Sequence, residues 1–139
     1  MATFQKFNQF VEDLAKGVHN LSTGQLKVAL TNTAPVAANS VYADLTSPLA
    51  TTNLSGATPF NVTTTSAEQT SGTLSLVLVD LTLTATGSVG PFRYVVLYND
   101  TPTSPADPLI GFYDYGSSVT MANTETFLID FASTTITIA

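Results

Sequence analysis

The sequence predicts an all-β protein, a two-sheet sandwich of jelly-roll type with about eight strands and one amphipathic helix at the N-terminus. Two observations predict this fold class. From Leu26 onward, short runs of Thr, Val and Ile alternate, which is typical of pleated, half-buried strands. Two long connections, 32–58 and 99–108, separate some of these runs, whereas a closed up-and-down barrel would have short and even turns.

The N-terminal residues 3–16 have the spacing of a helix. Thr3 is the predicted N-cap, and Gly17 stands just past the predicted end. The apolar side chains recur at helical intervals and form one face: Phe4, Phe7, Phe10, Val11 and Leu14. We expect residues 1–24 to form this helix and its connector and residues 25–139 to form the sandwich, as a single structural domain.

The aromatic face of this helix has two possible partners, because an amphipathic face must be buried somewhere. The nearer partner is the chain's own sandwich. The alternative is a neighbouring subunit, since aromatic anchors concentrate binding energy at protein interfaces. On this alternative, the five apolar residues of the face are the candidate protein-interface residues.

The strand pattern predicts strands at 26–31, 60–66, 73–79, 81–86, 92–99, 109–115, 124–131 and 134–138. Alternation is clearest in 81–86 and 135–138, where one face is apolar and the other carries hydroxyls. The segment 92–98 is apolar at nearly every position, which predicts a central strand covered on both faces. Asp80 interrupts the run from Leu76 to Leu83, and we predict a corner where the chain passes between sheets, with a bulge as the alternative.

The connections are predicted from their turn residues. Segment 99–108 holds three prolines and no large apolar residue before its end, so we expect a solvent-exposed loop. Within 32–58 a short helical turn at 40–45 is possible. Gly87-Ser88-Val89-Gly90 is predicted to be a hairpin turn, because it lacks the Lys and the following helix of a phosphate-binding loop.

Charge is scarce and unevenly distributed. Charged residues make up 10% of the chain, against about a quarter in an ordinary soluble domain, while Thr occurs 24 times. Residues 1–27 carry a net charge of +1, and the remainder carries −7, which gives the total of −6. An acidic body with few cations predicts no binding to nucleic acid and no attachment to a membrane through a basic patch. Neutral hydroxyls lose less than unpaired ions on desolvation, so such a surface suits contact with other proteins.

The sequence contains no recognisable catalytic, cofactor-binding or metal-binding set. There is no Cys, and His19 is the single histidine, with no nucleophile or carboxylate assigned to it by spacing. We expect it to be a residue at the end of the helix. Asp100, Asp107 and Asp114 are expected to be solvated loop acids, with a calcium site as the weaker alternative because their spacing matches no known calcium loop. The prediction is a protein that is not an enzyme and needs no cofactor.

Two segments carry a family resemblance. One is FNQFVEDLAKGVHNL at 7–21, leading into LKVALTNTAP at 26–35, and the other is GPFRYVVLYNDT at 90–101, followed by the proline loop. They resemble the capsid cement, or decoration, proteins of tailed bacteriophages of the jelly-roll type. The resemblance implies a virion protein that binds the outside of the head, bridges major capsid subunits and associates with itself as a homodimer or homotrimer.

Two other functions remain open at the level of sequence. One is another virion component, such as a tail-tube, connector or fibre-tip module. The other is a carbohydrate-binding or adhesive module, for which Tyr42 and Phe60 are the aromatic residues in or beside the long connection. The start of the chain has no secretory pattern and its apolar runs are short, so we expect synthesis in the host cytoplasm and a final place on the outer capsid surface.

Overall fold

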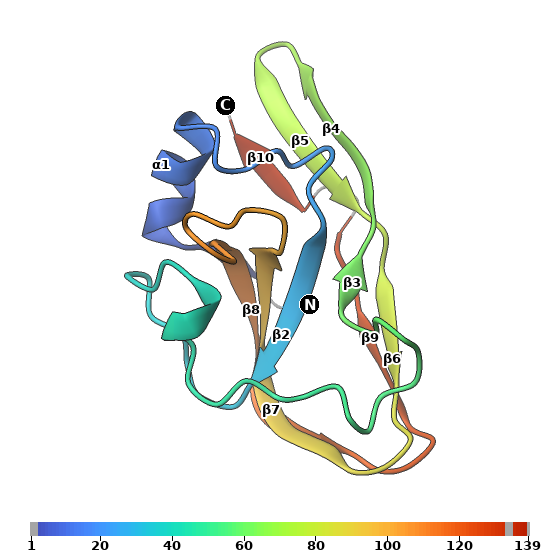
Figure 1. Ribbon diagram of the computed structural model, residues 1–139. Helices are drawn as coiled ribbons and strands as arrows, with labels where there is room; N and C mark the ends of the chain where they lie inside the picture. Colours follow the sequence, from blue (N-terminus) through green and yellow to red (C-terminus); the bar gives the residue numbers. More distant parts are fainter. Residues whose placement is uncertain (1–2, 133–134, 139) are drawn as a thin grey trace.

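The computed structural model describes residues 3–132 and 135–138. Antiparallel strands form a two-layer sandwich that is not closed into a barrel (Figure 1), which confirms the predicted fold class. One layer is a five-stranded sheet in the order β1-β8-β7-β2-β3. In that order its strands are Phe4–Lys6, Leu109–Met121, Val89–Asn99, Leu26–Thr31 and Asn61–Val62.

The opposite layer consists of two short sheets. A three-stranded sheet has the order β10-β5-β4, and a two-stranded sheet pairs β6 with β9. The bounds are Ile136–Ile138 for β10, Thr73–Leu78 for β5, Thr64–Thr70 for β4, Leu81–Thr84 for β6 and Thr126–Ile129 for β9. Figure 1 shows β4 and β5 above β6 and β9 along one side of the molecule, with β2, β7 and β8 beside them.

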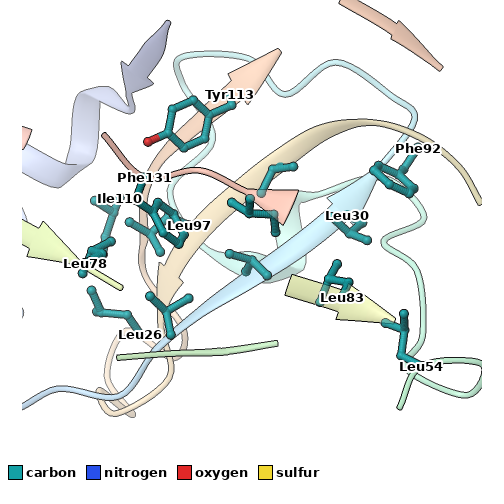
Figure 2. Packing of buried hydrophobic residues seen from close by; sticks show 14 of the residues in the cluster. Leu26, Leu30, Leu54, Leu78, Leu83, Phe92, Leu97, Ile110, Tyr113 and Phe131 are labelled. Carbon is teal, nitrogen blue, oxygen red and sulfur yellow. The ribbon is translucent and has the colours of Figure 1, made fainter. Parts of the chain in front are cut away.

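The main core lies between the two layers. Alternate residues of β2 and β7, among them Leu26, Leu30 and Leu97, meet Leu78 of β5 and Leu83 of β6 (Figure 2). All of these side chains are almost completely buried. The period-2 alternation seen in the sequence therefore marks the faces that pack between the layers.

A second core covers the outer face of the five-stranded sheet. Val96 and Tyr98 of β7 point to this side and pack with Phe7 and with Leu45. Leu45 follows a 3₁₀-helix at Tyr42–Asp44, inside the helical turn considered for 40–45. The prediction of a central strand at 92–98 covered on both faces is therefore confirmed, and part of the long connection supplies the cover.

The N-terminal segment differs from its prediction. The helix α1 spans Asn8–Ala15 rather than 3–16, and its N-cap is Phe7, with no side-chain cap, so the prediction of Thr3 as N-cap was wrong. Residues Phe4–Lys6 form β1 instead, paired with β8 in the register Phe4 to Tyr113. The edge of β8 offers these residues backbone hydrogen bonds that a further helical turn would have had to forgo. Gly17 follows the helix with φ of 75°, as a C-terminal glycine does.

Most predicted strands are present with changed limits. β2 has the predicted bounds, while β7 and β8 are longer than predicted and β9 is shorter, at Thr126–Ile129. The predicted strand 60–66 is divided into β3 and β4, which belong to different layers. Of the predicted strand 134–138, residue 134 lies outside the described residues. Of the loop predicted at 99–108, residues 100–107 are exposed or half-exposed as predicted, whereas Asn99 ends β7 and both Asn99 and Pro108 are buried.

The turn predicted at 87–90 is not a hairpin turn. β6, before it, pairs with β9, and β7, after it, pairs with β8 and β2. The segment instead carries the chain from one layer to the other. Gly90 has φ of 131° where the pairing of β7 with β8 shifts register, and a Cβ there would lie 2.6 Å from the carbonyl oxygen of Val119.

The predicted corner at Asp80 is confirmed. β5 ends at Leu78 in the three-stranded sheet, and β6 begins at Leu81 in the two-stranded sheet. The Oδ1 atom of Asp80 accepts a hydrogen bond of 2.9 Å from the backbone N–H of Phe131, which lies where the chain leaves β9 for β10. One carboxylate thus joins the two places where the chain passes between the short sheets.

Candidate interaction surface

The predicted interface residues on the N-terminal segment face mostly inward. Phe7 and Phe10 have no exposed surface. The ring of Phe7 lies 5.3 Å from that of Phe112 in the outer core, and the ring of Phe10 lies 5.2 Å from that of His19 in the main core. These aromatic anchors are therefore occupied by the chain itself.

The other three predicted interface residues divide between core and solvent. Phe4 and Leu14 are half-buried against the main core, and the ring of Phe4 lies 5.1 Å from that of Tyr113. Val11 is 52% exposed, whereas its neighbour Phe10 is fully buried. Of the five predicted residues, Val11 is thus the one that α1 presents most openly to a partner.

His19 follows the end of α1, as expected, and is a buried polar residue. It is 5% exposed, and its Nδ1 lies 3.3 Å from the Nδ2 of the fully buried Asn99. Burial lowers the pKa of His19, although the nearby Asp13 acts in the opposite direction. Its Nε2 has no hydrogen-bond partner within the described residues. Within the described residues, the contacts of the His19 ring are thus the Asn99 amide and the ring of Phe10.

The few cations are mostly tied to acids. Within the described residues, three of the four Lys and Arg side chains form ion pairs: Lys16 with Glu12, Lys27 with Asp100 and Arg93 with Asp114. The Arg93 pair is bidentate, at 2.8 and 3.0 Å. The surface that remains is acidic and hydroxyl-rich, with exposed Thr and Ser along β4 and along the second half of β8.

The three acids expected in loops do not converge on one point, and the expectation was wrong for Asp114, which lies within β8. Asp100 is paired with Lys27 at 3.1 Å, whereas Asp114 is held by Arg93, which lowers the pKa of that carboxyl. Burial, with Asp100 next to it, raises the pKa of Asp107. In the part of the chain that the structure describes, no three acidic or histidine side chains are grouped so that they could hold a metal ion.

A hollow of about 350 Å³ lies where β2 meets β3 and β7. Tyr42 and Phe60 line it together, and so do Tyr98, Lys27 and Asn61. The rings of Tyr42 and Tyr98 are 5.0 Å apart, and the Oδ1 atom of Asn61 is buried with no hydrogen-bond partner among the described residues. Sequence reasoning missed three of these residues, because strand pairing brings Lys27 opposite both Asn61 and Tyr98 and no local motif records it.

Comparisons with protein-family models, with curated proteins and with solved structures gave no match. No helix in the described part of the chain is long and apolar enough to cross a membrane.

Proposed function

We propose that this chain is a capsid decoration protein of a tailed bacteriophage, which binds the outside of the assembled head and stabilises contacts between major capsid subunits. The observation that supports the proposal is the composition of the surface, which has few free cations and many hydroxyls. Three of the four cations are held in ion pairs within the described residues, and the exposed strands carry neutral hydroxyls. Such a surface is covered by another protein at a small desolvation cost.

The acidic character of the chain supports a position outside the shell. A net charge of −6, with most cations tied to acids, repels packaged DNA and favours a partner surface of opposite sign. A protein that binds the assembled shell and not its separated subunits stabilises the shell by mass action. Each contact is modest, but many copies act on one head.

Binding to heads tests the proposal directly. Purified protein is mixed with heads that were assembled without it, and the mixture is sedimented and then heated while shell opening is followed by release of DNA. Stoichiometric co-sedimentation and a higher opening temperature are expected. Heads of an unrelated phage serve as the control, and the absence of both binding and stabilisation would remove the proposal.

The hollow beside Tyr98 favours a second candidate, a carbohydrate-binding module. Aromatic rings and polar groups around a shallow site can stack on a sugar and hydrogen-bond its hydroxyls. A glycan array probed with the wild type and with Tyr42→Ala tests it. Binding of a glycan that the variant loses would support this candidate, whereas an empty array would exclude it.

A further inference from the structure

The outer edge of β9 is an open edge of the sandwich. Within the described residues, β9 pairs with β6 alone, in the register Leu81 to Ile129. The neighbouring strand β8 is covered by β1 only at Gly111 to Tyr113, and beyond Tyr113 it pairs with β7 alone. Two unpaired strand edges therefore border the same side of the molecule, and such edges are templates for a further strand.

The register shows which backbone groups of β9 face outward. The N–H of Ala85 donates a hydrogen bond of 2.8 Å to the carbonyl oxygen of Glu125, so the backbone carbonyl of Glu125 points toward β6. Backbone groups alternate in direction along an antiparallel strand. The N–H and C=O of Thr126 and Leu128 consequently point away from β6, toward the open edge.

An apolar groove of about 290 Å³ lies between these two edges. It is lined by Tyr113 and Tyr115 from β8 and by Phe127 and Leu128 from β9. The rings of Tyr115 and Phe127 lie 5.2 Å apart, while Tyr115 is 54% and Leu128 56% exposed. Natural proteins protect an open edge with short strands, charges, a bulge or proline; β9 is short, at four residues, but it carries no charge, bulge or proline.

The charges at the groove indicate which kind of segment could bind there. Asp130 lines the groove and belongs to none of the ion pairs of the described residues. Glu125 stands exposed at the other end of β9. If two copies of this short strand paired antiparallel, the Glu125 end of each would lie alongside the Asp130 end of the other, and like charges would oppose the contact. A segment with Lys or Arg at its ends would instead complement both carboxylates.

We infer that the open edge of β9 and the adjoining groove bind an extended segment of another protein, which adds a strand to the sheet, places apolar side chains against Tyr115 and Phe127 and sets a basic residue near Asp130. This mode of recognition combines main-chain hydrogen bonds for affinity with a groove for specificity. The inference concerns any partner chain and does not depend on the partner being a capsid subunit.

A synthetic peptide is the probe. It is blocked at both ends, alternates Val with Thr and carries a Lys at each end, and a matched peptide carries Glu in place of the two Lys. Binding to the full chain is measured by fluorescence anisotropy, and hydrogen exchange of each amide is followed by NMR. We expect the Lys peptide to bind and to slow exchange of the amides of Thr126 and Leu128. The Glu peptide should bind more weakly.

Three variants separate the parts of the interaction. Leu128→Pro removes an outward N–H and leaves the pairing with β6 in place, because proline is tolerated where the N–H of an edge strand faces solvent. It should weaken binding roughly tenfold, as the loss of one buried hydrogen bond does. Leu128→Ala keeps the N–H and is the matched control. It should lose less affinity for the peptide than Leu128→Pro. Asp130→Asn should reduce the preference for Lys over Glu, because Glu125 then remains as the single carboxylate of the two.

Several results would overturn the inference. These are absence of binding at millimolar peptide, slowed exchange elsewhere than on β9, or equal affinity of the wild type and a folded Leu128→Pro variant. If Leu128→Pro does not fold, the exchange data on the wild type decide alone. Sedimentation of the free chain as a dimer that Leu128→Pro dissociates would show that a second copy occupies the edge. Binding to heads is a separate measurement, so its failure and the failure of the peptide test are distinguishable.

Discussion

Replacing Phe10 by Ala is expected to destabilise the fold strongly, while the same change at its neighbour Val11 should not. Phe10 has no exposed surface and packs on the ring of His19, whereas Val11 is 52% exposed. Removal of a buried Phe side chain costs about 3–5 kcal/mol, because both transfer free energy and packing are lost. Substitution at an exposed position changes stability by about 0.5 kcal/mol or less.

The loss at Phe10 is large against the total stability of a domain, which is about 5–15 kcal/mol. For a chain of 139 residues it corresponds to a fall in melting temperature of about 10–20 °C. The loss of unfolding free energy is measured by urea unfolding, followed by far-UV circular dichroism and tyrosine fluorescence. Phe10→Leu keeps an apolar side chain, so its free energy of unfolding should fall by less than about 1.5 kcal/mol. This variant replaces Phe10→Ala in the comparison if the Ala variant does not fold.

The same pair of variants separates the two partners of the aromatic face. If α1 were an arm for a neighbouring subunit, Phe10→Ala would leave the unfolding midpoint unchanged and abolish binding to heads. That result would refute the packing argument. If α1 contacts a partner through its outer side, Val11→Ala weakens binding without a change in stability.

Three further predictions concern titration and close packing. Because burial lowers the pKa of His19, the unfolded chain binds a proton below about pH 6.5 that the folded chain does not, so the free energy of unfolding falls as pH decreases through that range. The urea midpoint should show this fall, and His19→Gln should lack it. Gly111→Ala should lower the free energy of unfolding by about 1–3 kcal/mol and weaken the pairing of β1 with β8, since a Cβ there would lie 2.6 Å from the carbonyl oxygen of Gln5. Faster amide exchange across Phe4–Lys6 would show the weakened pairing, and unchanged exchange would contradict it. Arg93→Met should raise the pKa of Asp114 toward its ordinary range, measured by carboxyl NMR titration, because the Arg93 side chain is the main cause of its lowering.

The parts of the fold that sequence predicts best are those in which a local pattern and the tertiary environment agree. β2 alternates because one of its faces meets the main core, and its predicted bounds are those observed. The nearly continuous apolar run of β7 identified a strand covered on both faces, since two separate cores demand apolar residues at successive positions.

The errors arise where long-range pairing decides the structure. Phe4 fits the helical spacing of Phe7 and Phe10, yet it belongs to a strand because the edge of β8 is available to it. Gly87 to Gly90 has the composition of a hairpin, but its flanking strands pair elsewhere. The interface predicted on α1 stays a prediction, and the open edge of β9 could not be predicted because unpaired backbone leaves no mark in the sequence.

The hydrogen bond from Phe131 to Asp80 has a mechanical consequence. It links two crossings between the short sheets that are 51 residues apart in the chain. A motion that drew these crossings apart would have to break this hydrogen bond, and Asp80→Ala would leave the N–H of Phe131 without this acceptor.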